Sequence, residues 1–125
     1  MEENSKQLLL KDLSSRLPYH TRVKVWLKDG TTEEGALDLE HNYGDVLRDA
    51  FYYNEIIDIK PYLFPLSSMT EEQSKVYHEL IKGMFGTSAL INFEVLTDFF
   101  NSNHLDYRGL IEKSLALDAT GLNIY

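Results

Sequence analysis

The stretch that most constrains the fold is "TRVKVWLKDGTTEEGALDLE", residues 21–40, in which apolar residues alternate with polar ones around an Asp29-Gly30 pair. Such alternation is typical of a strand with one buried face, and Asp-Gly is typical of the turn between two such strands. The stretch therefore predicts a β-hairpin. Its apolar positions are Val23, Val25, Leu27, Leu37 and Leu39.

The numbering of these residues also predicts the loop. All five positions are odd, and a two-residue loop would pair odd with even positions and split the set between the two faces. A three-residue loop, Lys28 to Gly30, pairs odd with odd and keeps the set on one face. We therefore expect Gly30 in the left-handed conformation next to a bulge. We also expect Trp26 to face away from the apolar set.

Further elements precede and follow the hairpin. Residues 5–17 predict a helix, because leucines recur there at four-residue spacing. Residues 45–51 and 55–60 predict two more strands. Pro61 and Pro65 predict the end of the sheet, because proline has no N–H to donate to a strand ladder.

Two helices are expected in the second half of the chain. Thr70 and Gln73 form a capping-box pattern at the start of the first helix, and Gly83 is placed to end it. Asn92 is a suitable N-cap for the second helix, which ends near Asn101. For residues 110–125 a short helical turn and an extended tail both remain open.

This order of elements predicts an α+β fold: an N-terminal helix, a small bent antiparallel sheet or an SH3/Sm-like barrel, then two C-terminal helices. The length of 125 residues and the absence of a linker predict a single domain over residues 1–125. Within it, residues 1–65 are expected to form a helix plus β-sheet region. Residues 66–125 are expected to form a helical region packed on it.

Composition excludes several classes of protein. The chain has no cysteine, which removes disulfides, thiol nucleophiles and cysteine-ligated metals. Neither a signal peptide nor an apolar run of membrane-spanning length is recognisable, so we expect a soluble cytoplasmic protein with no membrane contact. The net charge of −8 is spread evenly over both halves. This charge favours solubility and disfavours a wide contact with nucleic acid.

The stretch "NHLDYRG", residues 103–109, collects His104, Asp106, Tyr107 and Arg108. As a reactive site, His104 would act as a general base beside Asp106 while Arg108 held an anion. As a helix exit, Asn103 would adopt the left-handed conformation, and Asp106 with Arg108 would tie the loop to its neighbours. We favour the structural interpretation, and we expect no catalytic residue.

No cofactor or metal is expected either. The histidines are His20, His41, His78 and His104, and none of them forms a ligand pair at helical spacing. Phosphate-binding and dinucleotide-binding loops are also missing from the sequence. The aromatic residues are more suggestive, because exposed tryptophan and tyrosine often anchor protein interfaces. Trp26, Tyr52 and Tyr53 are therefore the candidate partner-binding residues.

Three motifs carry a resemblance to a known group of proteins. "LLLKDLSSRLPY", "IKPYLFPLSSMTEE" and "FFNSNHLDYRGLIEKSLALDA" together resemble a family of small uncharacterised proteins from gut Bacteroidetes. Such proteins often occur in prophage-like or mobile-element-like regions. The resemblance spans nearly the whole chain, and it implies no activity, catalytic residue or cofactor.

A partial resemblance concerns the N-terminal half. "VKVWLKDGTTEEGAL", preceded by a helix, is similar to the first motif of Sm-like RNA-binding proteins. The Asp-x-x-Met-Asn run and the Arg-Gly pair that would contact RNA are both missing. The resemblance therefore implies a small barrel more than it implies RNA binding.

Three hypotheses of function follow. The first is a non-enzymatic intracellular protein-interaction module of mobile-element or prophage type. The second is an Sm-like binder of single-stranded nucleic acid, which requires stacking aromatics beside a basic patch of Arg22, Lys24, Lys28 and Arg48. The third is an acidic decoy of a nucleic-acid-binding protein, for which the net charge of −8 is the motive. The sequence names no partner and no oligomeric state.

Overall fold

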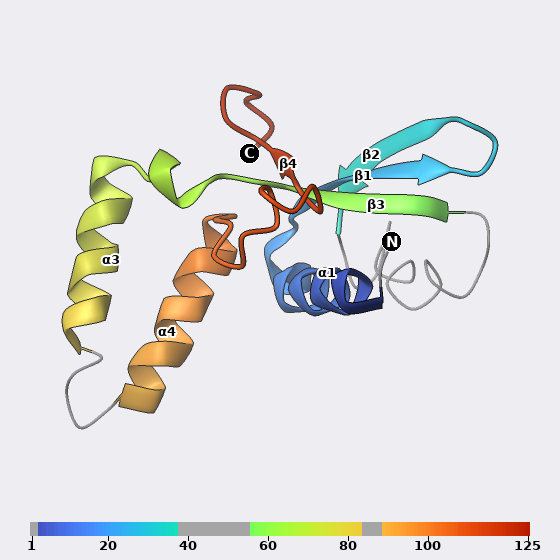
Figure 1. Cartoon of the computed structure of the whole chain (residues 1–125). Coiled ribbons are helices and arrows are strands. Elements are labelled where there is room, and N and C mark those ends of the chain that lie inside the picture. The colour runs from blue at the N-terminus through green and yellow to red at the C-terminus, as the bar shows by residue number, and fades with distance from the viewer. Residues whose placement is uncertain (1–2, 38–55, 84–88) are drawn as a thin grey trace.

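The computed structural model describes residues 3–37, 56–83 and 89–125 (Figure 1). The expected strand over residues 45–51, together with Arg48, Tyr52 and Tyr53, lies outside the described residues. The helices are α1 (Glu3–Arg16), α3 (Glu71–Gly83) and α4 (Ala89–Ser102), with 3-10 turns at Leu17–Tyr19 and Leu66–Ser68. The strands are β1 (Arg22–Leu27), β2 (Thr32–Ala36), β3 (Ile56–Leu63) and β4 (Leu117–Asp118).

The described strands form one mixed sheet in the order β2-β1-β3-β4. β1 is antiparallel to β2 and β3, whereas β4 runs parallel to β3. The predicted α+β class is confirmed, but the sheet is not purely antiparallel, and its described strands form an open sheet rather than a barrel. The physical reason is that the chain returns after α4 and lies along β3 in the same direction as β3 (Figure 1).

The hairpin has the predicted loop. The backbone N–H of Leu27 donates to the carbonyl of Thr31 at 2.8 Å, which leaves the three residues from Lys28 to Gly30 outside the ladder. Gly30 has φ +89°, the left-handed conformation that was expected. The pairs Val23–Gly35 and Val25–Glu33 join odd positions to odd positions, as the parity argument requires.

The prediction that Pro61 ends the sheet is wrong, because β3 continues through it to Leu63. Pro61 is paired with Val23 at one end of the β1 ladder, and Tyr62 begins the pairing with β4. Pro61, which has no N–H to donate, therefore lies where the pairing of β3 with β1 ends and its pairing with β4 begins. A proline is tolerated at such a position, since few ladder hydrogen bonds depend on it.

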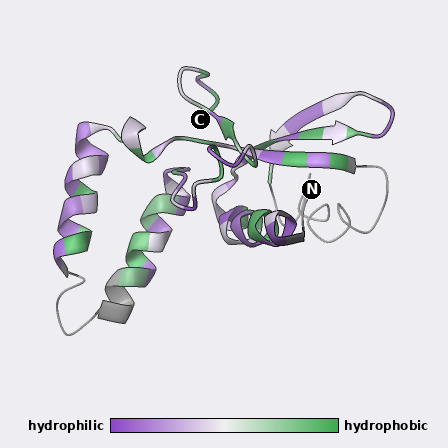
Figure 2. Ribbon diagram, in the orientation of Figure 1, coloured by the Kyte–Doolittle hydropathy of each residue, from purple (hydrophilic) through white to green (hydrophobic). Residues whose placement is uncertain are grey.

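The main core lies between α1 and the inner face of the sheet. Leu9 and Leu13 of α1 are fully buried against Val23, Val25 and Ile59. Along β3 the apolar residues alternate with polar ones, which Figure 2 shows as alternating green and purple bands. This alternation leaves the opposite, outer face of the sheet to polar and aromatic side chains.

Helices α3 and α4 lie side by side, away from the β1–β2 hairpin (Figure 1). The predicted capping box is confirmed: Gln73 N–H donates to the hydroxyl of Thr70 at 3.1 Å, and Thr70 N–H donates to the Gln73 side chain at 2.9 Å. α4 begins at Ala89, so the expected N-cap, Asn92, lies inside the helix. Residues 110–125 form turns and the short strand β4.

Candidate functional site

The outer face of the sheet has Trp26 on β1, flanked by Thr32 of β2 and Asp58 of β3. Its neighbours Val23 and Val25 are fully buried, so the alternate positions on β1 point away from α1. The Trp26 side chain is partly exposed. We define the outer face by its charged and aromatic residues, which are Arg22, Lys24, Trp26, Glu34, Asp58, Lys60 and Tyr62.

The ammonium groups of two lysines lie near the Trp26 ring. The Nζ atoms of Lys24 and Lys60 lie 5.4 Å and 5.5 Å from the ring centroid, within the range of a cation–π interaction. The two lysines are also direct cross-strand partners. Like charges at such positions are destabilising, so this pair of lysines opposes sheet stability.

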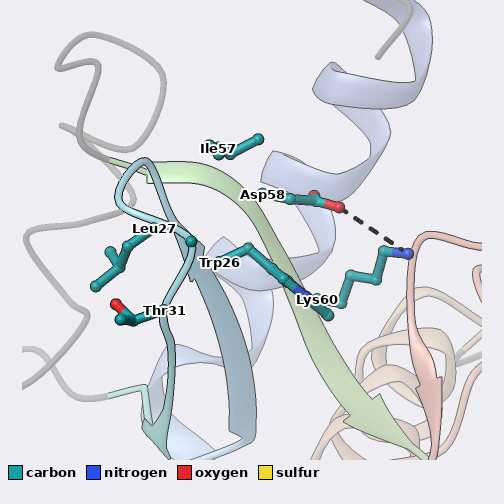
Figure 3. A pocket seen from close by; sticks show the side chains of 7 residues that line it. Trp26, Leu27, Thr31, Ile57, Asp58 and Lys60 are labelled. Carbon is teal, nitrogen blue, oxygen red and sulfur yellow. Dashed lines mark ion pairs between the residues drawn. The ribbon is translucent and has the colours of Figure 1, made fainter.

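A hollow of about 380 Å³ lies beside Trp26 (Figure 3). Its rim includes a bulge in β3: Trp26 pairs with Asp58 and Leu27 pairs with Ile56, so Ile57 between them has no partner on β1. The Ile57 side chain is 67% exposed. The residues that line the hollow are Trp26, Leu27, Gly30, Thr31, Ile57, Asp58 and Lys60.

The carboxylates of the outer face have partners within the protein. Tyr62 donates a hydrogen bond to Glu34, and burial together with that carboxylate raises the pKa of Tyr62 to about 12. Asp58 lies 4.0 Å from Lys60, a long ion pair that Figure 3 shows at the edge of the hollow. Lys24 forms no ion pair within the described ranges.

Sequence reasoning identified part of this site. Trp26 faces away from the core, as expected, and Arg22 and Lys24 accompany it on the outer face, whereas Lys28 lies in the hairpin loop. Lys60 and Ile57 were missed. The alternation along β3 could have assigned Lys60 to the polar face, but its position opposite Lys24 depends on the register between β1 and β3.

The "NHLDYRG" stretch lies elsewhere, where α4 ends. His104 itself adopts the left-handed conformation, with φ +57°, one residue after the expected Asn103. Its Nδ1 lies 3.2 Å from the hydroxyl of Thr21, and its ring stacks on Tyr125 at 3.7 Å. Burial, with a contribution from the nearby Arg16 guanidinium, lowers the pKa of His104 to about 4.

Asp106, the carboxylate considered as the partner of His104, binds backbone N–H groups of the following turn. Asp106 accepts hydrogen bonds from the backbone N–H groups of Leu110 and Ile111, both at 2.9 Å. Asp106 is also 7% exposed, so these bonds hold it as a buried cap for the following turn. The His104–Asp106 hydrogen bond that general-base catalysis would use is not among the bonds of these described residues.

Arg108 is also tied to the protein. Its Nη1 donates to Asp12 at 2.7 Å and to the hydroxyl of Ser15 at 3.2 Å. Arg16 donates to the second oxygen of Asp12 at 2.9 Å and to the carbonyl of Leu105 at 2.6 Å. Asp12 and Arg16 are fully buried, so this network joins α1 to the segment after α4.

Tyr107 completes the stretch. Its ring stacks on Phe100 at 4.9 Å, and the Arg108 guanidinium lies 4.4 Å from its centroid. These contacts stabilise the fold, and they favour the structural interpretation for all four residues, His104, Asp106, Tyr107 and Arg108.

Among the described residues, no group of three His, Asp or Glu side chains could hold a metal ion. Within the same ranges, every helix is too short or too polar to cross a membrane. Comparisons of the chain with protein-family models, with curated proteins and with solved structures find no match.

Proposed function

We propose that the chain is a non-enzymatic protein-interaction module, of the mobile-element or prophage type that the family resemblance implies, and that it binds another protein through the outer face of the sheet. The observation that supports this proposal is the position of Trp26. This residue is the only tryptophan of the chain, and it lies outside the apolar core clusters of the described residues. Folding of the core therefore does not account for it.

The surroundings of Trp26 have the properties of an interface centre. Tryptophan contributes disproportionately to binding energy when a partner covers it, and a rim of polar residues around it excludes water. The exposed Ile57 adds apolar area next to it, and the hollow of about 380 Å³ has room for a side chain of a partner. Lys24, Lys60 and Asp58 supply the polar rim.

Binding of single-stranded nucleic acid is the second candidate, because an aromatic ring next to lysines is a known stacking platform for bases. Two observations weigh against it. Asp58 and Glu34 interrupt the positive charge of the outer face, and the net charge of −8 opposes a phosphate chain. The acidic-decoy hypothesis rests on that net charge alone and on no particular site.

The test is affinity purification of the tagged protein from host lysate, with and without nuclease, in three forms: wild type, Trp26→Ala and Phe93→Ala. Phe93 is the matched control, because it is an exposed aromatic residue on α4, 59% exposed and away from the sheet. We expect the same protein to be captured by wild type and Phe93→Ala, to be lost with Trp26→Ala, and to withstand nuclease.

Two other results would contradict the proposal. Undiminished capture by Trp26→Ala would show that the outer face is not the binding surface. Capture that nuclease abolishes would favour the nucleic-acid candidate instead. Circular dichroism of each variant separates loss of binding from loss of fold.

A further inference from the structure

We infer that the outer face binds an acidic peptide segment, in which one carboxylate contacts both Lys24 and Lys60 and a neighbouring apolar side chain enters the hollow beside Ile57. This inference rests on the proposed function and specifies its partner. It begins from the placement of two ammonium groups over one ring, at 5.4 Å and 5.5 Å from its centroid.

The placement of the two lysines has an electrostatic cost. Lys24 and Lys60 are direct partners across the β1–β3 ladder, where like charges repel. Within the described residues Lys60 has Asp58 at 4.0 Å, and Lys24 has the Trp26 ring and faces Glu34 across the β1–β2 ladder without an ion pair. An anion that contacts both ammonium groups would offset this repulsion. The two lysines therefore form a positively charged site in the absence of the partner.

The other half of the site is apolar. The bulge at Ile57 leaves this isoleucine 67% exposed next to Trp26 and the partly exposed Leu27. An apolar side chain placed in the hollow of about 380 Å³ would remove these surfaces from water together. Figure 3 shows Ile57, Trp26 and Lys60 around the same hollow, so the charged and apolar contacts lie side by side.

Two carboxylates of the outer face distinguish a peptide from a phosphate chain as the ligand. The Asp58 carboxylate lies in the lining of the hollow itself, and Glu34 lies opposite Lys24 on β2. Successive phosphates would meet both carboxylates, whereas a peptide with a single carboxylate brings one negative charge to the lysine pair, where Asp58 already lies 4.0 Å from Lys60. The charge arrangement therefore favours an acidic and apolar peptide over a nucleic acid.

The experiment uses the fluorescence of Trp26, because the chain has one tryptophan and it lies in the site. The probes are two acetylated, amidated pentapeptides, Ser-Glu-Ser-Leu-Ser and Ser-Leu-Ser-Glu-Ser, in which the acidic and apolar side chains share one face of an extended chain. The reference probes replace glutamate with glutamine. Oligothymidylate tests the nucleic-acid outcome.

We expect at least one glutamate peptide to change the Trp26 emission with saturation in the millimolar range, and the glutamine peptides to bind several-fold more weakly. Lys24→Met and Lys60→Met keep most of the side-chain length and remove the charge, and each should weaken the glutamate peptide about fivefold, as for an exposed ion pair. Lys28→Met, in the exposed hairpin loop, is the matched control and should bind as wild type does.

Equal binding of glutamate and glutamine peptides, no change in emission with either glutamate peptide, or saturation by oligothymidylate alone would overturn the inference. The lysine variants also separate it from the proposed function. If Trp26→Ala loses the captured protein while Lys24→Met and Lys60→Met retain it, the outer face is the binding surface and the acidic specificity is wrong. If Trp26→Ala retains it, the proposed function itself fails.

Discussion

The hydroxyl of Tyr125 donates a hydrogen bond to the backbone carbonyl of Tyr62 at 2.7 Å. The same hydroxyl accepts a hydrogen bond from the backbone N–H of Arg22 at 2.8 Å. Arg22 and Tyr62 are the next positions after Val23–Pro61, at one end of the β1–β3 ladder. A tyrosine side chain thus bridges the two strands there, and burial raises the pKa of its hydroxyl.

We expect Tyr125→Phe to lower the free energy of unfolding by about 1–2 kcal/mol, because it leaves a backbone donor and a backbone acceptor without their partner. Urea titration followed by circular dichroism measures the change. Tyr62→Phe is the control, since it removes a hydroxyl whose partner, Glu34, is exposed to water. Equal losses in the two variants would contradict a structural role for the Tyr125 bridge.

Acid should destabilise the protein through His104. The pKa of this histidine is about 4 in the folded protein, against 6.5 as its ordinary value, so the unfolded chain binds the proton more readily. The contribution of His104 to stability is therefore complete above about pH 6.5 and is lost as the pH falls towards 4. Its largest size is on the order of 3 kcal/mol.

The measurement is the urea midpoint between pH 7 and pH 4 for wild type and His104→Gln. The variant should show a shallower fall in stability, because its side chain does not titrate. His78→Gln, which replaces an exposed histidine of α3, should follow the wild-type curve. Parallel curves for wild type and His104→Gln would refute the assignment.

Asp12 should be critical for stability, because it is fully buried between the guanidinium groups of Arg16 and Arg108. Asp12→Asn leaves Arg16 without its counter-charge in the interior. We expect a loss of about 3–5 kcal/mol in the free energy of unfolding, measured by denaturant titration.

The exposed Glu79–Lys82 pair of α3 provides the comparison, since both side chains are 77% exposed. Glu79→Gln should change stability by less than about 0.5 kcal/mol. A loss for Asp12→Asn as small as this control would mean that Asp12 does not hold α1 to the segment after α4.

Trp26→Ala should cost less stability than Leu13→Ala, although tryptophan is the larger residue. Leu13 is fully buried in the core, where such a truncation costs about 2–5 kcal/mol, whereas Trp26 lies on the outer face against two lysine side chains. Thermal unfolding of the two variants measures the difference. A larger loss for Trp26→Ala would assign the tryptophan to folding and remove the main support for the binding face.

Local patterns were sufficient for several elements. The parity of the apolar residues predicted the loop from Lys28 to Gly30, and the Thr70–Gln73 spacing predicted the start of α3. Both features depend on residues close in the chain, whose geometry the backbone itself sets. The outward direction of Trp26 follows from the same alternation.

Tertiary structure alone decided the rest. The register of β3 against β1 placed Lys60 opposite Lys24. Strand β4, which has two residues and is too short to show a periodicity, made the sheet mixed. Asp12 and Arg108, 96 residues apart in the sequence, came into contact. Such contacts form only when distant segments pack together, and they leave no spacing in the sequence. Alternation along a strand therefore determines which face a side chain occupies, while the packing of the chain determines which side chains it meets there.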